Sequence, residues 1–239
     1  MSKTFLSAEW RNLVMVNYKV PPEVLKNYLP FKTEIDLWKD VCYVSLVGFM
    51  FLNVKVKGFR IPFHTNFEEV NLRFYVIHKD QSTNEWKRGV VFIKEIVPKP
   101  AIVFVANTIY KENYESMKME HEWKINESNV QIRYSWKKES WNHLKVTAAL
   151  EKKLISKESE EEFITEHYWG YTKLGERKTS EYEVQHPVWN RYEIIDHETD
   201  VDFGEIYGND FNFLNNEKPV SVLLAEGSEI KVNEGRIIT

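Results

Sequence analysis

The sequence predicts a single β-rich α+β domain spanning residues 1–239, with many short strands and a peripheral layer of helices. Aromatic residues make up 14% of the 239 residues, and aromatic and β-branched side chains favour strands. Short apolar segments recur between polar turns at regular spacing, which is typical of a barrel or a sandwich. The chain has only 9 Gly and 8 Pro, and no linker, repeat or low-complexity segment divides it.

Alternation of apolar and polar residues, together with turn signals, places most of the elements. We expect strands over residues 13–18, 66–76, 89–97, 120–125, 131–137, 143–150, 182–184, 192–195 and 220–225, and two or more within 34–56. A short helix is expected after Pro21, because proline suits the first helical turn, and another over residues 159–167 behind a serine cap.

Three further segments have weaker patterns. Residues 101–109 (AIVFVANTI) fit either a strand or a buried helix, and their β-branched content favours the strand. Residues 110–119 are expected to form a short helical or irregular link. Residues 202–214 are aromatic and are expected to be helical in part.

Charge and composition exclude several classes of protein. The net charge is −4, with 32 basic and 36 acidic residues intermixed, so no basic block indicates a nucleic-acid surface. The first residues lack the apolar core of a signal peptide. The longest apolar run, residues 41–52, is shorter than the roughly 20 residues that a membrane-spanning helix needs. We therefore expect a cytoplasmic protein with no nucleic-acid partner and no membrane association. Homo-oligomerisation stays open.

The segment 66–76 (NFEEVNLRFYV) carries the clearest candidate site. Side chains in a strand point alternately to opposite faces. One row of this strand is apolar (Val70, Leu72, Phe74, Val76) and the other is polar (Glu69, Asn71, Arg73, Tyr75). The polar row fits the wet face of an antiparallel sheet, or it lines a cavity with a carboxylate, an amide, a guanidinium and a phenol.

The usual strong motifs of catalysis are absent, including GxGxxG, the P-loop, GxSxG, HExxH and CxxC. No two of the seven histidines have the helix spacing of a metal site, so neither a metal nor another cofactor is expected. His167 and His186 lie among aromatic residues, which fits a packed, hydrogen-bonded ring or a neutral imidazole acting as acid, base or donor. Cys42 lies in an apolar run and is expected to be a buried structural thiol.

Several stretches together resemble a family of uncharacterised bacterial proteins, the YqjF-like proteins. The matching stretches run from about Glu9 to Glu229 and read EWRNLVMVNYKVPPEVLKNYLP, FEEVNLRFYV, RGVVFIKEIV, EHYWGY, EYEVQHPVW and SVLLAEGSE. The most specific of them is FxExNxRxYV, from Phe67 to Val76. This family carries no established activity, and its fold is similar to that of acetoacetate decarboxylase.

That more distant resemblance implies a closed antiparallel barrel or cone that encloses a substrate pocket, with a few helices outside. In the decarboxylase, a lysine forms a Schiff base with a keto acid, and an arginine and a glutamate line the pocket. Arg11 and Glu69 match the arginine and the glutamate. Tyr114 falls about where the lysine is expected, whereas Lys111 and Lys118 are offset by a few residues. Lys94, inside an apolar strand, is explained more simply by an ion pair with a neighbouring carboxylate.

Three functions remain as alternatives. The first is an interior pocket that binds a small carboxylate or carbonyl compound, with Arg11, Asn71, Arg73 and Tyr75 as ligand-binding residues and a Glu69–Arg73 or Glu69–Arg11 pair. The second is a lyase- or hydratase-like enzyme acting on a small keto acid, with Glu69 as general acid/base and Tyr114 or His186 assisting. The third is a structural or interaction protein, which an exposed cluster of Trp169, Tyr171 and Trp189 would support. Whether the protein is an enzyme stays open.

Overall fold

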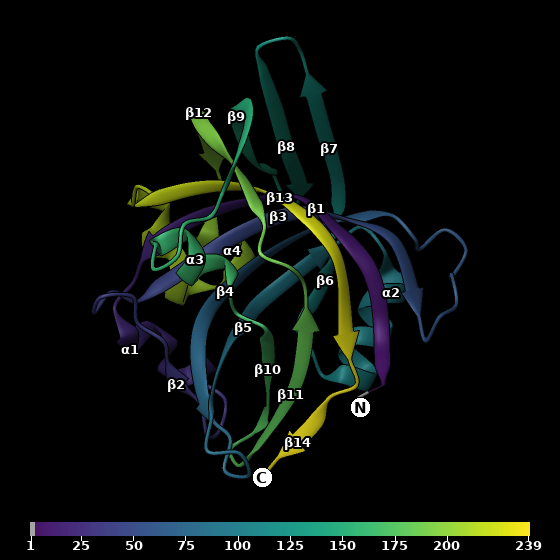
Figure 1. Cartoon of the computed structure of the whole chain (residues 1–239), viewed down its shortest axis with the longest axis vertical. Helices are drawn as coiled ribbons and strands as arrows, with labels where there is room; N and C mark the ends of the chain where they lie inside the picture. The colour runs from purple at the N-terminus through teal and green to yellow at the C-terminus, as the bar shows by residue number, and fades with distance from the viewer. Residues whose placement is uncertain (1–2) are drawn as a thin grey trace.

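The computed structural model describes residues 3–239, apart from the side chains of residues 109 and 110, and most of these residues lie in strands (Figure 1). The strands are β1 (Thr4–Lys19), β2 (Glu34–Ile35), β3 (Tyr43–Val56), β4 (Phe67–Lys79), β5 (Trp86–Val97), β6 (Tyr114–Ser116), β7 (Lys118–Ile125), β8 (Asn129–Lys137), β9 (Trp141–Leu154), β10 (Trp169–Gly175), β11 (Lys178–Gln185), β12 (Asn190–Asp200), β13 (Ser221–Asn233) and β14 (Arg236–Ile238). The expected β-rich fold is confirmed.

The helices are short and lie around the strands. They are α1 (Pro22–Leu25) with a 3-10 turn η1 (Lys26–Tyr28), α2 (Pro100–Val105) with a π-helical turn η2 (Ala106–Tyr110), α3 (Glu160–Thr165), and α4 (Phe203–Tyr207) with a 3-10 helix η3 (Asn209–Asn216). Two of them begin as the sequence predicts. Pro22 occupies the first turn of α1, and the Ser159 hydroxyl accepts a hydrogen bond from the Glu162 amide at the start of α3.

The sheet curves into a ring because its pairing returns on itself. Neighbouring strands follow the order β11, β10, β5, β4, β3, β1 and β13, and β13 then pairs with β11 through Val184 with Val232 and Gln185 with Lys231. Strands β12, β9, β8 and β7 continue the sheet beyond β13, and the β7–β8 hairpin projects from the ring (Figure 1). The sheet is mixed rather than wholly antiparallel, because β5 pairs in parallel with β10 and with β6.

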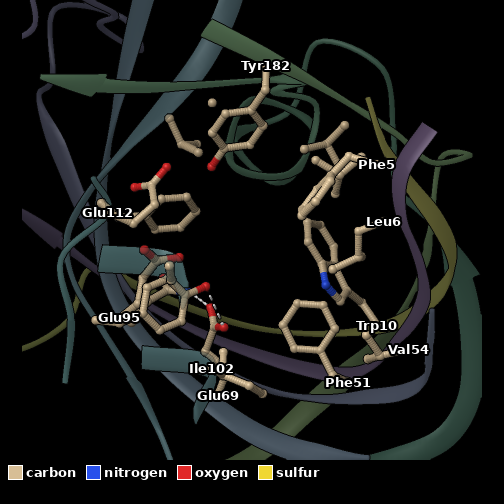
Figure 2. A pocket seen from close by; sticks show the side chains of 18 of the residues that line it. Phe5, Leu6, Trp10, Phe51, Val54, Glu69, Glu95, Ile102, Glu112 and Tyr182 are labelled. Atoms are coloured by element: carbon tan, nitrogen blue, oxygen red, sulfur yellow. Dashed lines mark hydrogen bonds between the residues drawn. The ribbon is translucent and has the colours of Figure 1, made fainter. Parts of the chain in front are cut away.

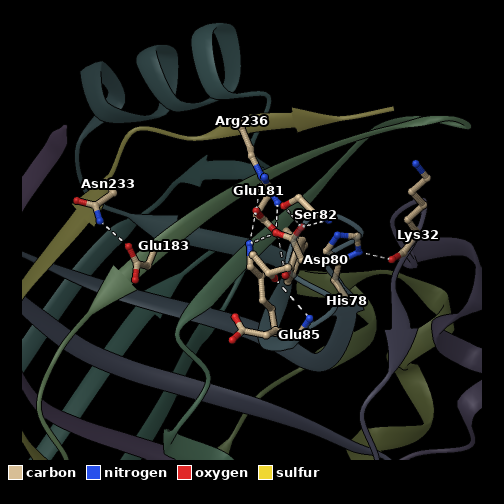
Figure 3. Close-up of polar contacts among 12 residues, drawn as sticks. Lys32, His78, Asp80, Ser82, Glu85, Glu181, Glu183, Asn233 and Arg236 are labelled. Atoms are coloured by element: carbon tan, nitrogen blue, oxygen red, sulfur yellow. Dashed lines mark hydrogen bonds and ion pairs between the residues drawn. The ribbon is translucent and has the colours of Figure 1, made fainter. Parts of the chain in front are cut away.

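Ion pairs fasten the end of the ring where β14 lies. Lys87 Nζ lies 2.7 Å from Asp80 Oδ2 and 3.1 Å from Glu181 Oε1. Arg236 binds the same two carboxylates at 2.5 and 2.7 Å (Figure 3). These cations, Lys87 first, hold the pKa of Asp80 well below its usual range. Near the seam, the Asn233 amide donates a hydrogen bond of 2.7 Å to Glu183.

Apolar packing occurs on both faces of the ring. On the outer face, side chains of β1, β3, β4 and β5 pack under α4, η3 and the sheet extension β8–β9; Val70, Leu72, Phe74 and Val76 belong to this layer and are fully buried. On the inner face, a second cluster contains Leu13, Val47, Phe67 and Phe163 of α3. The strand β4 is therefore buried on both sides, so its polar row is not a wet sheet face.

Two expectations about the chain after β5 need correction: the strand preferred over a helix for residues 101–109, and the helical or irregular link over residues 110–119. Residues 101–109 form α2 and η2 rather than a strand. The inward-facing positions Ala101, Ile102, Val105 and Ala106 recur at helical spacing, and packing of this face at the ring outweighs the β-branched preference. Residues 114–116 form β6, and β7 begins at Lys118, so this segment is not a helical link.

Candidate functional site

A cavity of about 650 Å³ occupies the inside of the ring. One side of the cavity is apolar, with Phe5, Leu6, Trp10, Phe51 and Val54, and the opposite side carries acidic side chains (Figure 2). The polar residues of its lining include Glu69, Asn71, Arg73, Glu95, Glu112, Tyr114, His167, Tyr182 and His186. The interior is therefore large enough for a small organic molecule and offers both an apolar wall and hydrogen-bonding groups.

The polar row of β4 points into this cavity. Glu69, Asn71 and Arg73 line it. Tyr75, one step further along the strand, is fully buried, and its hydroxyl lies 2.6 Å from Ser45 Oγ. The strand thus contributes a carboxylate, an amide and a guanidinium to the cavity lining. The Tyr75 phenol lies outside the lining, where it packs and hydrogen-bonds with Ser45.

A β-bulge in β5 brings a second carboxylate inside. Leu72 of β4 pairs with Lys94, but the next residue, Arg73, pairs with Phe92, so Ile93 is an extra residue in β5. Val90 and Phe92 face the cavity, and simple alternation would place Lys94 beside them. The bulge shifts the alternation by one residue, so that Glu95 lies opposite Asn71 inside the ring and Lys94 lies outside.

The third carboxylate and its neighbours come from the segment after η2. Strand β6 pairs in parallel with β5 and places Tyr114 beside Glu95. The Tyr114 hydroxyl donates to Glu69 Oε2 at 3.1 Å, and the Asn71 amide donates to Glu69 Oε1 at 3.0 Å. Glu112 accepts a hydrogen bond of 2.6 Å from the Thr172 hydroxyl. We call Glu69, Asn71, Glu95 and Glu112 the acceptor cluster.

Two atoms of the acceptor cluster lack hydrogen-bond partners. Glu95 Oε2 and Asn71 Oδ1 are buried and have no partner in the structure, and the two side chains are 3% and 2% exposed. Buried polar atoms are nearly always hydrogen-bonded, and leaving one unpaired costs roughly 1–3 kcal/mol. Asn71 Oδ1 can only accept, and Glu95 Oε2 accepts when its carboxyl is ionised, so the ionised cluster is incomplete in its hydrogen-bond donors.

Burial raises the pKa values of these carboxyls. Desolvation raises the pKa of Glu69 to about 7, although hydrogen bonds from Asn71 and Tyr114 act in the opposite direction. Desolvation also raises the pKa of Glu112 to about 7. The pKa of Glu95 lies well above its usual range because of desolvation and the charges of Glu112 and Glu69. The cluster therefore holds protons near neutral pH and can donate or accept them.

Arg73 is half-buried on the same wall and has no carboxylate partner among the described residues. Its Nη2 donates to the Ile164 carbonyl oxygen of α3 at 3.0 Å, its guanidinium lies 5.5 Å from the Tyr75 ring centroid, and its Nε is unpaired. The expected Glu69–Arg73 pair is therefore wrong. The alternative Glu69–Arg11 pair is also wrong, because Arg11 forms its ion pair with Glu9 at 2.6 Å and lies outside the cavity lining.

Both aromatic-flanked histidines reach the cavity. The ring of His186 stacks on Trp189 with centroids 4.2 Å apart, and its Nδ1 lies 2.9 Å from the Pro187 carbonyl oxygen, so hydrogen bonding does not connect it to Glu69. His167 is buried, and its Nε2 lies 3.1 Å from Asp36. Desolvation lowers the pKa of each histidine to about 4, so both rings are neutral at pH 7.

No lysine lies deep in the described part of the cavity. Lys94 forms an ion pair with Glu115 at 2.7 Å outside the ring, and Lys118 pairs with Glu120. Lys111 caps η2 with an exposed side chain. The one lysine of the described lining, Lys57, is 62% exposed and pairs with Glu234. The expected ion pair of Lys94 with a carboxylate is confirmed, and the carboxylate is that of Glu115.

The exposed aromatic cluster that would support a structural or interaction protein does not form, because Tyr171 and Trp189 are buried. Among the described residues, no helix is long and apolar enough to cross a membrane. Cys42 is a buried free thiol, as expected, and burial raises its pKa to about 11.

Residues 7–229 match the model of a protein family, DUF2071, described as "Uncharacterized conserved protein". The chain belongs to this family. A curated relative is the uncharacterized protein YqjF of Bacillus subtilis (strain 168), which is 23% identical over 181 residues, covering 75% of this chain and 72% of YqjF. The family resemblance seen in the sequence is therefore confirmed.

Solved structures confirm the fold at lower sequence identity. Acetoacetate decarboxylase from Legionella pneumophila has a TM-score of 0.65 at 12% identity, covering 99% of this chain and 88% of that chain. An acetoacetate decarboxylase-like enzyme from Sphingomonas wittichii RW1 has 0.66 at 10%, covering 99% and 94%. The enduracididine biosynthesis enzyme MppR in complex with pyruvate also has 0.66 at 10%, covering 100% and 92%. The DUF2071 chain thus has the fold of these enzymes.

Proposed function

We propose that the interior cavity binds a small carboxylate or carbonyl compound with an apolar body. The observation that carries this proposal is Arg73, a guanidinium on the cavity wall with no carboxylate partner and an unpaired Nε. A charged group away from bulk water is costly unless it is paired, and guanidinium offers planar donors that match a carboxylate. A ligand carboxylate or carbonyl oxygen at Arg73 would supply the missing acceptor.

The other lining groups support such a ligand. The apolar side, with Trp10, Phe51 and their neighbours, would contact its hydrocarbon part. The Asn71 amide and the carboxyl groups that carry protons near neutral pH would add hydrogen bonds to a second polar group. A structure of MppR, which shares the fold, is a complex with pyruvate, and that also supports a small carbonyl ligand. A cytoplasmic location and homo-oligomerisation stay predictions.

The test compares Arg73 with Arg11, because the sequence predicts both arginines as ligand-binding residues. We expect 2-oxo-4-phenylbutanoate and pyruvate to raise the unfolding temperature of the wild-type protein, since binding to the native state stabilises it. In Arg73→Gln the shift should disappear, with affinity at least tenfold lower by calorimetry, which corresponds to about 1.4 kcal/mol. Arg11→Gln removes the same charge outside the lining and should bind like wild type. Equal binding by Arg73→Gln would contradict the proposal.

The second candidate function is an enzyme of the lyase or hydratase type, and the environment of Glu69 favours it. Its pKa of about 7 suits a general acid/base at neutral pH, and Tyr114 holds it by a 3.1 Å hydrogen bond. We expect any turnover of small keto acids, followed by proton NMR, to fall by at least about a hundredfold in Glu69→Gln. His186→Asn tests the assisting role of that histidine. Unchanged turnover in Glu69→Gln would exclude this chemistry.

A further inference from the structure

We propose that the acceptor cluster binds a protonated amine, so that the ligand of this cavity carries a cationic nitrogen in addition to the group held by Arg73. The inference deepens the proposed function and rests on it for the cavity and the anionic end of the ligand. The cationic end has its own evidence in hydrogen bonding, charge and the shape of the surrounding wall.

When the carboxyls are ionised, the acceptor cluster needs hydrogen-bond donors from a ligand. The two unpaired atoms, Glu95 Oε2 and Asn71 Oδ1, lie on paired positions of β5 and β4, and both side chains line the cavity. The Asn71 nitrogen is already used as a donor to Glu69. A ligand group that only accepts would leave Asn71 Oδ1 unpaired, whereas an ammonium group offers three donors and no acceptor.

The charge of the cluster points the same way. Glu69, Glu95 and Glu112 come from β4, β5 and the segment after η2, and no ion pair among the described residues involves any of them. Figure 2 shows the three carboxyls on one side of the cavity, with the Tyr182 hydroxyl pointing in from above. Buried carboxylates stay charged only when they are paired, so a ligand cation is the natural partner of this side.

An organic cation fits better than a metal ion. The described residues contain no group of three or more His, Cys, Asp or Glu placed to hold a metal. The rings of Tyr114 and Tyr182 flank the cluster, and aromatic faces attract ammonium groups. Facing the carboxyls lies the apolar side with Phe5, Leu6 and Trp10 (Figure 2), which would accept the hydrocarbon part of an amine.

The spacing on β4 suggests how both ends of one ligand would fit. Glu69 and Arg73 are four residues apart on one strand face, so their Cα atoms are separated by roughly 13 Å. A molecule that carries an amine at one end and a carboxylate or carbonyl at the other would span from the acceptor cluster to Arg73, past Asn71.

The test uses three probes with one aromatic body: 2-phenylethylamine, 2-phenylethanol and 3-phenylpropionate. By calorimetry at pH 7.5, we expect the amine to bind wild-type protein at least tenfold more tightly than the alcohol. Glu95→Gln should weaken amine binding by at least tenfold and leave 3-phenylpropionate binding equal or stronger. Glu115→Gln, which removes a carboxylate that pairs with Lys94 outside the ring, is the matched control and should bind all three like wild type.

The outcomes separate the two proposals. If the alcohol binds as tightly as the amine, or if Glu95→Gln binds the amine like wild type, the cation site is wrong. If the amine binds as expected but 3-phenylpropionate binding does not depend on Arg73, the cation site stands and the proposed function fails. Glu112→Gln repeats the comparison should Glu95→Gln not fold, as judged by circular dichroism.

Discussion

At the scale of residues, the site depends on three carboxyls whose environment the sequence does not reveal. Alternation in β4 correctly pairs Glu69 with Asn71 and Arg73 on one face. It gives no signal for Glu95, because Ile93 interrupts the alternation of β5, nor for Glu112 and Tyr182, which reach the cavity from distant segments. The sequence did not show which basic side chains reach the cavity, because that depends on their partners in the fold: Glu9, two residues away, for Arg11, and Glu115, from another strand, for Lys94.

The raised carboxyl pKa values predict a pH dependence of stability. A carboxyl whose pKa is higher in the folded than in the unfolded state stabilises the fold at low pH and loses this contribution as pH rises through the folded pKa. The lowered pKa values of His167 and His186 act oppositely, and their effect fades above the unfolded pKa of about 6.5. Between pH 6.5 and 8, the free energy of unfolding should therefore fall, by about 1 kcal/mol for each carboxyl with a pKa of about 7.

Urea unfolding at pH 6.5 and pH 8 measures this dependence. Glu69→Gln and Glu112→Gln should each show a smaller decrease than wild type, because an amide does not titrate. Glu115→Gln, whose carboxyl has a lowered pKa, should keep the wild-type decrease over this range. A wild-type stability that rises from pH 6.5 to 8 would contradict the assignment of raised pKa values.

At the scale of elements, the position of Tyr114 depends on the turn η2. The Asn107 side chain imitates a neighbouring strand: its Nδ2 donates to the Tyr114 carbonyl oxygen at 2.8 Å, and its Oδ1 accepts from the Tyr114 amide at 2.8 Å. On its other side, β6 pairs with β5. This explains why a segment without a strand pattern nevertheless forms a strand, since its partners lie on a helix and on a parallel neighbour.

Asn107→Ala should remove both hydrogen bonds. We expect a loss of about 2 kcal/mol in the free energy of unfolding, because each hydrogen bond contributes roughly 1 kcal/mol. Binding of any ligand that contacts Glu69 should also weaken, since Tyr114 would lose its fixed position. Urea unfolding and calorimetry with the probes above measure the two effects, and wild-type values in both would show that β5 alone holds β6.

At the scale of the whole molecule, local patterns predicted the fold class, the meander of β7, β8 and β9, and the capped helix α3. The closure of the ring could not be predicted from the sequence, because it depends on strand pairs between residues far apart in the chain, such as Val184 with Val232. The parallel pairing of β10 with β5 was missed for the same reason, and with it the placement of Tyr182 beside the carboxyls.

The seam between β11 and β13 is the shortest strand contact in the ring, together with that between β10 and β5; each has two residue pairs. Segments with few backbone hydrogen bonds to their neighbours open at lower free energy. Strands β10 and β11 pair with each other along their length, but this hairpin joins the other strands of the ring only through these two short contacts. In hydrogen–deuterium exchange, peptides covering the β10–β11 hairpin should therefore exchange before peptides covering β4, which pairs along most of its length with β3 and β5. Simultaneous exchange would show that the ring opens only as a unit.

The extra residue Ile93 also bears on how such a cavity can change during evolution. With the bulge, Glu95 faces inward and Lys94 outward; if Ile93 instead took a regular place in the ladder, strict alternation from Phe92 would bring Lys94 inside and turn Glu95 away. Deletion of Ile93 would remove the bulge and keep Glu95 inside, because Phe92, Lys94 and Glu95 would then alternate inward, outward and inward. The side chain that β5 presents opposite Asn71 can therefore change through the register of the strand as well as through substitution.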